Sequence, residues 1–282
     1  MLARVLTSKT VRSLIAAAPR GGARVSRIIS RRFPMNGVCE LVGPLAEASM
    51  YLDTSDPFQA EMAYGKYQPE STERIFHLVR PGDVVLTAGA QLGYVSLALA
   101  KAVGPTGKVL AFEADPRMIE ACRRNLALNQ FGEVVQLLPF GLGAANGEFE
   151  MSLSGTPGQS SLAIAHHCVG STSVPVRNGD EVLAGLGISR IDGILLDVEG
   201  WEVQVLKGLR NTLSRYLPRW AIVECWDVAL RSAGSSAEQL LQELKRLGWQ
   251  LSTLDGSSPR DGGDIVCTRA TSFSIQSLSE VA

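Results

Sequence analysis

Hydrophobic and polar positions follow a regular strand-and-helix order from about residue 80 onward. Short apolar runs of strand length predict strands at residues 83–87, 108–113, 134–138, 193–197, 220–225, 249–254 and 264–268. Apolar residues at helical spacing predict helices at residues 95–102, from 116 onward, at 201–215 and at 237–247. A glycine-rich turn at 88–93 joins the first strand directly to the first helix.

This alternation determines the expected fold class. Strands that alternate with helices indicate a parallel sheet covered on both faces. The last two strands are separated only by a loop, and a parallel crossover needs a dozen or more residues, so they can pair only as a hairpin. The sequence therefore predicts an α/β fold with a doubly wound, mostly parallel seven-stranded sheet and an antiparallel last strand.

The chain divides into segments of different composition. We assign residues 80–270 to the main domain, with a Gly-, Ser- and Thr-rich insertion at 141–178 that forms strands or a lid. Residues 1–40 form a basic amphipathic N-terminal segment, and residues 41–79 are expected to form an N-terminal helical cap. Residues 271–282 remain as a C-terminal tail.

The N-terminal segment differs from the rest of the chain in charge. Residues 1–39 carry eight Arg or Lys and no acidic residue, and Glu40 is the first acid. Three interpretations stay open for residues 1–35. They are a cleaved organelle transit peptide, an amphipathic helix in peripheral contact with an anionic membrane, or a basic helix docked on the domain.

The remaining residues are acidic and contain scattered cysteines. They hold 19 basic residues against 28 acidic ones, a net charge of −9, which argues against a nucleic-acid partner because such proteins present a basic face. The five cysteines include no C-x-x-C pair, a usage typical of a reducing compartment. We expect a cytoplasmic location, or a mitochondrial one if residues 1–35 are a transit peptide.

The first strand, turn and helix are the predicted ligand site. In an open α/β sheet, ligands bind at the carboxyl ends of the strands. Gly89 and Gly93 permit a tight turn, and Glu113 ends the next strand 20 residues later, where a carboxylate can accept both ribose hydroxyls of an adenosine. A pyrophosphate requires G-x-G-x-x-G, whereas the middle position here is Gln91. S-adenosylmethionine is therefore favoured, and a NAD-dependent oxidoreductase stays as an alternative.

Three sequence blocks resemble the FkbM family of methyltransferases, with similarity from about residue 56 to 270. The blocks are Arg80–Tyr94, Val109–Pro116, and Leu196–Glu202 with Val205–Gly208. The resemblance implies a class I, Rossmann-like methyltransferase with S-adenosyl-L-methionine as its cofactor. The cofactor-binding positions that we expect are Thr87, Gly89, Gln91, Gly93, Glu113, Phe140 and Asp197.

The sequence departs from the family pattern at three positions. Thr87 replaces the acid that ends the first strand, Gln91 replaces an Asn, and Leu195 replaces a basic residue. In the family, the strand-one acid helps to hold the amino group of the cofactor. A charge-assisted hydrogen bond contributes about 1.5–3 kcal/mol. A catalytically weakened or silent pseudo-methyltransferase is therefore an alternative.

Three carboxylates are the candidate catalytic groups. Asp197 and Glu199 follow the fourth strand of the domain, and Glu224 lies near the end of the fifth. We expect Asp197 to act as general base, supported by the other two, in O-methylation of a hydroxyl on a small molecule or glycan. Hard cations prefer oxygen ligands, but nothing in this spacing requires a metal.

Other residues have two interpretations each. His166 and His167 in the insertion could act as a base from a lid or be incidental. Trp201 and Trp226 could line an acceptor pocket or be packing residues. The pair Ser160-Ser161 resembles a family element near the cofactor, and turn chemistry explains it equally well.

Overall fold

The main domain is built on a seven-stranded sheet. The computed structural model describes residues 2–18, 21–131, 133–156, 158–163, 167–259 and 261–269; the predicted tail at 271–282 lies outside them. The strands of the sheet are β3 Val84–Ala88, β4 Lys108–Phe112, β5 Val135–Leu138, β9 Gly193–Leu196, β10 Trp220–Cys225, β11 Gln250–Thr253 and β12 Gly263–Thr268. Their order is β11-β12-β10-β9-β3-β4-β5, and β12 runs antiparallel to both of its neighbours. The predicted sheet is confirmed.

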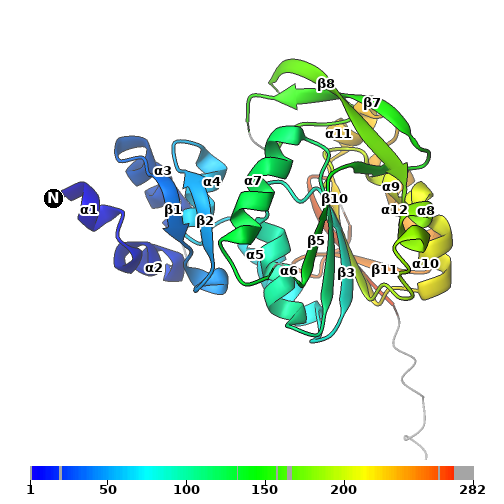
Figure 1. Cartoon of the computed structure of the whole chain (residues 1–282), viewed down its shortest axis with the longest axis horizontal. Coiled ribbons are helices and arrows are strands. Elements are labelled where there is room, and N and C mark those ends of the chain that lie inside the picture. Colours follow the sequence, from blue (N-terminus) through cyan, green and yellow to red (C-terminus); the bar gives the residue numbers. More distant parts are fainter. Residues whose placement is uncertain are drawn as a thin grey trace, which may run out of the picture.

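Helices cover both faces of this sheet (Figure 1). One layer contains α5 Pro69–Leu78, α6 Tyr94–Val103 and α7 Pro116–Ala127. The other contains α8 Gly179–Gly185, α9 Glu202–Gly208, α10 Arg210–Tyr216 and α12 Ala237–Arg246. Val85 and Val109 join the core of the first layer, while Leu86 and Leu110 join that of the second. Strands buried on both faces in this way have continuous apolar runs rather than alternating ones.

The helical prediction for residues 201–215 was wrong in one detail. Leu209 separates α9 from α10. A Cβ atom at Gly208 would lie only 1.9 Å from the carbonyl oxygen of Gly143, so α9 ends against the backbone of the insertion. A further short helix, α11 Asp227–Ser232, follows β10 and was not predicted.

The insertion at 141–178 forms a sheet of its own. Its strands are β6 Gly141–Gly143, β7 Gly147–Ser154 and β8 Cys168–Asn178, in the order β6-β8-β7. Figure 1 shows β7 and β8 as a long hairpin over one edge of the main domain. The prediction that this stretch forms strands is confirmed.

The N-terminal residues form a small lobe beside α7 (Figure 1). Its elements are α1 Leu2–Leu6, α2 Lys9–Ala17, α3 Gly22–Arg32, β1 Asn36–Glu40, the 3-10 turn η1 Gly43–Leu45, β2 Ser49–Asp53 and α4 Pro57–Ala63. Strands β1 and β2 pair antiparallel. The expectation of a purely helical cap at 41–79 was therefore wrong, and the boundary after residue 40 falls inside a β hairpin. The sequence signal that was missed is the alternation of residues around the apolar Met50 and Leu52, which the structure shows as alternating burial.

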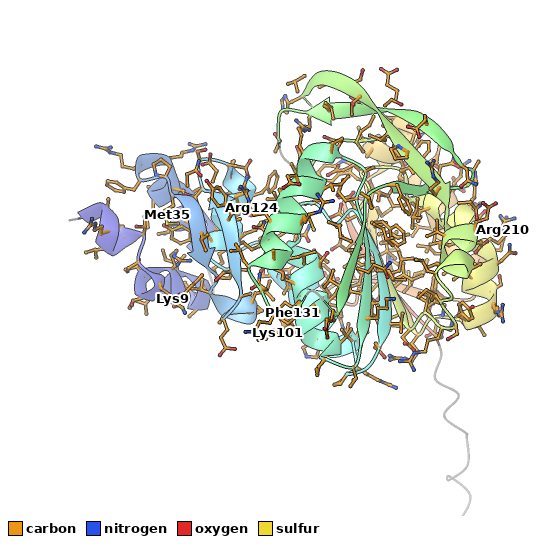
Figure 2. The ribbon with its side chains drawn as sticks, in the orientation of Figure 1. Lys9, Met35, Lys101, Arg124, Phe131 and Arg210 are labelled. Atoms are coloured by element: carbon orange, nitrogen blue, oxygen red, sulfur yellow. The ribbon has the colours of Figure 1, made fainter. Side chains whose placement is uncertain are left out.

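Two asparagines, one in α7 and one just after it, attach the lobe to the main domain. Asn125 accepts a hydrogen bond from the backbone N–H of Tyr51 (2.7 Å), and Asn129 accepts one from that of Ser49 (2.9 Å). The guanidinium of Arg124 lies 3.8 Å from the centre of the Tyr51 ring (Figure 2). These contacts satisfy the free edge of β2, which would otherwise be open for pairing with another chain.

Basic side chains fasten the N-terminal helices to this lobe. The buried guanidinium of Arg12 donates hydrogen bonds to the carbonyl oxygens of Glu40 (2.7 Å) and Ala63 (2.8 Å). Lys66 donates to two carbonyl oxygens at the end of α2, at 2.8 and 2.7 Å. Cations are favourable partners for the carbonyl end of a helix. Within the described residues, no helix combines the length and the apolar character needed to cross a membrane.

Candidate functional site

The residue that follows β9 lies against the turn that follows β3. Gly89 has φ +88°, and a Cβ atom there would lie 1.8 Å from the carbonyl oxygen of Asp197. The N–H of Asp197 donates to the carbonyl oxygen of Ala88 at 3.1 Å. Glycine is therefore required here by the approach of the neighbouring strand, and that approach sets Asp197 beside the turn.

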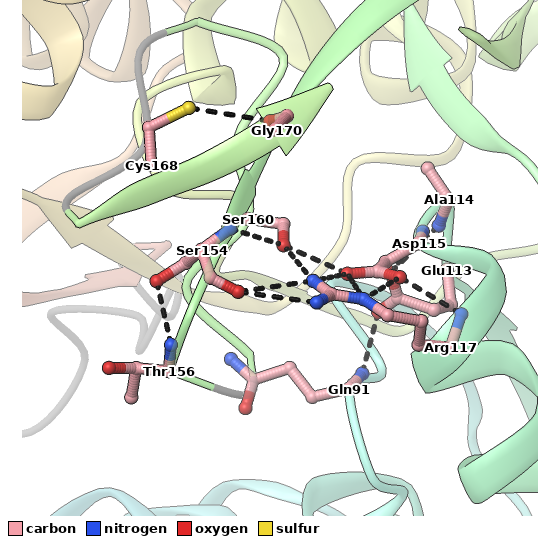
Figure 3. A network of polar contacts seen from close by, with 10 residues as sticks. All are labelled: Gln91, Glu113, Ala114, Asp115, Arg117, Ser154, Thr156, Ser160, Cys168 and Gly170. Atoms are coloured by element: carbon pink, nitrogen blue, oxygen red, sulfur yellow. Dashed lines mark hydrogen bonds and ion pairs between the residues drawn. The ribbon is translucent and has the colours of Figure 1, made fainter. Parts of the chain in front are cut away.

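Glu113 holds this turn from the end of β4. One oxygen of its carboxylate accepts a hydrogen bond from the N–H of Gln91 (2.7 Å), and the other accepts from the N–H groups of Ala114 (2.9 Å) and Asp115 (2.8 Å) (Figure 3). Burial raises the pKa of Glu113 to about 7, against the effect of these hydrogen bonds. The oxygen that faces Gln91 accepts a single bond here and keeps an acceptor position.

A first cavity opens beside Glu113, with a volume of about 540 Å³ that includes the open space at its mouth. Its floor is the carboxyl end of the sheet, with Gly89 and Asp197, and its cover comes from the insertion, with Met151 and Leu162. Its other lining residues are Ala88, Gln91, Phe112, Ala114, Asp115, Met118, Gly141, Leu142, Gly158, Ser160, Val198, Glu199 and Trp201. This mixture of an apolar wall and a few polar groups is typical of small-molecule sites.

An ion-pair network ties the cover to the sheet (Figure 3). The buried carboxylate of Asp115 pairs with Arg117 at 2.8 Å and accepts a hydrogen bond from the hydroxyl of Ser160 at 2.8 Å. Burial alone would raise the pKa of Asp115, but the hydrogen bonds from Arg117 and Ser160 lower it below its usual value. Arg117 also donates a hydrogen bond to the carbonyl oxygen of Ser154 at 3.3 Å. These contacts hold the insertion over the cavity.

Three carboxylates converge at the edge of the first cavity. The nearest oxygens of Asp197, Glu199 and Glu224 all lie within 4.8 Å of one another. Burial, together with Asp264, raises the pKa of Asp197 to about 6. Burial and the neighbouring Asp197 raise that of Glu199 to about 8. The pKa of Glu224 lies well above its usual value, because of burial and then of the charges of these two acids.

A second cavity lies on the other side of these carboxylates. Its volume is about 1360 Å³, including the open space at its mouth. Four residues line both cavities, namely Gln91, Gly158, Asp197 and Glu199. The remaining lining residues are Asp56, Phe58, Glu61, Met62, Tyr67, Gln68, Leu92, Gln159, His167, Glu224, Trp226 and Ala229. The N-terminal lobe therefore supplies one wall of the second cavity through α4.

Comparison with known proteins assigns the chain to a family. The family model described as the methyltransferase FkbM domain matches residues 87–251, which covers more than half of the chain and every carboxylate of the cluster. The chain belongs to the FkbM methyltransferase domain family. The resemblance read from the three sequence blocks is confirmed.

The individual relatives are only distantly similar in sequence to this chain. Methyltransferase sdnD of Sordaria araneosa is 30% identical over 173 residues, which cover 51% of this chain and 66% of that protein. The AMB antimetabolite synthetase AmbE of Pseudomonas aeruginosa is 26% identical over 211 residues, which cover 61% of this chain and 10% of that protein. Among solved structures, the methyltransferase FkbM of Methylobacillus flagellatus is 14% identical with a TM-score of 0.45, covering 74% of this chain and 52% of that one. The chain thus spans just under two thirds of the first relative and a tenth of the second.

Most residues that we expected in the site of this FkbM domain lie together. Gly89, Gln91, Glu113 and Asp197 line the first cavity. Glu199 lines both cavities with Asp197, and Glu224 lines the second. Gln91 has φ +49°, a left-handed conformation that asparagine adopts more readily than most residues, which gives a backbone reason for the Asn of the family pattern.

Three expected cofactor residues do not line either cavity. Thr87 is fully buried on the face of β3 that belongs to the first core layer, and its hydroxyl has no hydrogen-bond partner among the described residues. Gly93 begins α6 with φ +93° and abuts Cys122. Phe140 packs edge-on against Phe112, with ring centres 5.7 Å apart. For Thr87 the side-chain direction decides the case, because successive side chains of a strand point to opposite faces of the sheet.

The residues with two interpretations are also located. Trp201 lines the first cavity, and Trp226 and His167 line the second; His166 lies outside the described residues. The hydroxyl of Ser161 donates to the carbonyl oxygen of Glu199 at 2.7 Å. The insertion is therefore bonded to the backbone of the carboxylate cluster as well as to Asp115.

Sequence reasoning missed the residues that reach the site from a distance. Asp115 precedes the predicted helix start at Pro116, and the Asp-Pro pair marks it as a helix cap, but its burial under the insertion has no local signal. Tyr67 donates a hydrogen bond to Gln91 at 3.3 Å, and Gln68 donates one to Asp197. Both follow α4, outside the main domain that was predicted.

Proposed function

We propose that the protein is an S-adenosylmethionine-dependent methyltransferase that methylates a hydroxyl group of a small molecule or glycan. The observation that carries this proposal is the meeting of two cavities at Asp197 and Glu199. One cavity has the features of an adenosine site, and the other is open to an acceptor. The family assignment supports methyl transfer and disfavours the NAD-dependent alternative.

The residues of the first cavity fit S-adenosylmethionine. The carboxylate of Glu113 can accept a ribose hydroxyl, and Ala88, Phe112 and Leu142 offer apolar surface to the adenine. The aromatic side chain of Trp201 adds to the wall of this cavity. The bound cofactor would supply a methyl group on a positively charged sulfur.

The second cavity would hold the acceptor, with its hydroxyl close to the shared carboxylates. Methyl transfer requires an acceptor held in line with the sulfur–methyl bond. Asp197 or Glu199 can take the hydroxyl proton, because a general base works best when its pKa lies near the working pH, and the two values are about 6 and about 8. Glu224 lines only the second cavity, so its role is with the acceptor.

The basic N-terminal segment adds a proposal on location. We propose that residues 1–35 stay attached in the working protein, because Arg12 and Lys66 bind α2 to the lobe that walls the second cavity. A cytoplasmic location follows most simply; a mitochondrial one would require removal of residues 1–35 as a transit peptide. Mass spectrometry of the protein isolated from its own cells would reveal the mature N-terminus, and a cut between residues 18 and 36 would contradict attachment.

Calorimetry and methyl transfer together test the proposed function. S-adenosylhomocysteine should bind the wild type, and tritiated methyl groups should pass from S-adenosylmethionine to members of a hydroxyl-bearing panel of small molecules and glycans. Glu224→Gln should lower transfer while leaving the affinity for S-adenosylhomocysteine within about threefold, since the side chain lines the second cavity and not the first. Glu133→Gln, which changes an exposed acid, is the matched control and should alter neither.

Two outcomes would contradict the proposal in different ways. Absence of S-adenosylhomocysteine binding at millimolar concentration would remove the cofactor site. Binding without transfer to the panel and without slow hydrolysis of the cofactor would instead favour the silent pseudo-methyltransferase. That alternative was suggested by Thr87.

A further inference from the structure

We propose that the acceptor carries a protonated amine, and that this ammonium is held in the second cavity between Glu224 and the ring of Trp226. The inference rests on the proposed function, because it is there that the second cavity is assigned to the acceptor. It specifies the substrate class as hydroxyl compounds that are organic cations at neutral pH.

The first argument is the charge of the second cavity. Five carboxylates line it, and no Lys or Arg is among its described lining residues. Two of the five already have partners within the lobe. Asp56 caps α4 by accepting from the N–H of Gln59 (2.9 Å), and Glu61 pairs with Arg27 (3.1 Å). The acids that remain are Asp197, Glu199 and Glu224.

These three acids have no cationic partner in the described part of the chain. The ion pairs formed by the described residues involve other side chains. Besides one another, the three acids face the charges of two further acids, Glu202 and Asp264. Buried charges in proteins are normally paired. The raised pKa values of the cluster express the cost of keeping negative charge there without compensation.

The cofactor cannot balance the cluster alone. S-adenosylmethionine carries a sulfonium and an ammonium against one carboxylate, and it would meet only the two acids that face both cavities. Glu224 faces the second cavity alone. One oxygen of Glu224 is buried and has no hydrogen-bond partner among the described residues. The carboxylate of Glu224 lines the second cavity and can accept N–H donors from an acceptor there, of which an ammonium supplies up to three.

The second argument is the aromatic wall beside Glu224. Trp226 follows the end of β10 in extended conformation, so it lies on the same side of the strand as Glu224, two residues earlier. Its side chain is 50% exposed, which packing does not explain. Tyr67 and Phe58 line the same cavity with ring centres 6.3 Å apart. Aromatic faces beside carboxylates are the groups with which proteins recognise organic cations.

A divalent metal is the competing occupant of the three carboxylates. Their oxygens are close enough to ligate one. The organic cation is favoured because the cavity extends far beyond the cluster, with a volume of about 1360 Å³ that includes the open space at its mouth. In addition, an aromatic wall offers no ligand to a hydrated metal ion. A metal would also leave the exposed face of Trp226 without a role.

Binding of two nearly isosteric probes tests this inference. Benzylamine is a cation at pH 7.5, whereas benzyl alcohol is neutral and similar in shape. Calorimetry on the full chain, with and without saturating S-adenosylhomocysteine, should show benzylamine binding at least about tenfold more tightly, as a charge-assisted contact with a carboxylate predicts. Glu224→Gln should reduce this preference to about threefold or less, and Trp226→Leu should weaken benzylamine more than benzyl alcohol. The control Glu133→Gln should leave it intact.

The outcomes separate this inference from the proposed function. Equal affinity for the two probes in folded wild-type protein would overturn it. So would binding of Mg²⁺ alone that is lost in Glu224→Gln while benzylamine fails to bind. Thermal unfolding of each variant shows whether it is folded. Loss of S-adenosylhomocysteine binding contradicts the proposed function instead, and the probe preference can still be measured on the cofactor-free chain.

Discussion

Replacing Glu113 by alanine tests the proposed adenosine site most sharply. The carboxylate lies at the end of β4 beside the first cavity and accepts three backbone hydrogen bonds, one of them from the turn at Gln91. In the proposed complex it also accepts from the ribose. A hydrogen bond to a charged group contributes about 1.5–3 kcal/mol. Glu113→Ala should therefore weaken S-adenosylhomocysteine binding by about 10- to 150-fold.

The same substitution also disturbs the turn, so the assay must separate folding from binding. Each unpaired buried donor destabilises the fold by about 1–3 kcal/mol, and the unfolding temperature should fall. Calorimetric titration with S-adenosylhomocysteine should be run well below that temperature. Glu120→Ala on the adjacent helix α7 is the matched control, since that side chain is 75% exposed, and it should leave the dissociation constant within about twofold.

One result would refute the reasoning about Glu113. A dissociation constant unchanged in a folded Glu113→Ala variant would mean that the carboxylate serves only the turn. The ribose would then bind elsewhere, and the first cavity would lose its main polar contact. A loss equal to that in Glu120→Ala would lead to the same conclusion.

Three further predictions concern the packing and charge of the site. Thr87→Val should raise the free energy of unfolding by about 1 kcal/mol and leave cofactor affinity unchanged, because the hydroxyl is buried with no hydrogen-bond partner among the described residues and lines neither cavity. Weaker S-adenosylhomocysteine binding would restore Thr87 to the site. Gly89→Ala should destabilise the fold by at least about 3 kcal/mol in chemical denaturation, because its Cβ would overlap the carbonyl oxygen of Asp197. The control Gly104→Ala, at φ +67° with open space around it, should lower the free energy of unfolding by only about 1 kcal/mol. Equal losses in the two variants would contradict the overlap. The unfolding temperature of the ligand-free protein should fall as the pH rises from about 5 to 8. The reason is that Glu113, Asp197 and Glu199, with pKa values of about 7, 6 and 8, keep protons in the folded state that they release when unfolded. Glu199→Gln should make the unfolding temperature depend less on pH, and an unfolding temperature that rises with pH would show that the buried acids are ionised.

The sequence was sufficient to predict the main sheet and the centre of the site. Strands buried on both faces have apolar runs that are visible without a structure, as at residues 84–88 and 193–196, and loop length alone fixed the hairpin of β11 and β12. Glu113 and Asp197 could be assigned to the site because carboxyl ends of neighbouring parallel strands meet at one edge. These inferences depend on local periodicity and on topology rules.

The residues that the sequence did not reveal depend on side-chain direction or on distant contacts. Thr87 lies near the end of β3, as predicted, but it is fully buried on the face that belongs to the core layer of α6. The sequence pattern of a strand that is buried on both faces does not show which face a residue takes. The second cavity takes one wall from α4, which belongs to a lobe that Asn125 and Asn129 help to hold against the main domain. Such contacts join residues more than 70 positions apart, and no local pattern encodes them.

A crystal structure of the full chain with S-adenosylhomocysteine tests the central claim most directly. The account predicts the ribose hydroxyls within hydrogen-bond distance of the Glu113 carboxylate, the adenine under the insertion, and the sulfur facing the gap between Asp197 and Glu199 that opens into the second cavity. A ligand bound in the second cavity, or a ribose out of reach of Glu113, would contradict it.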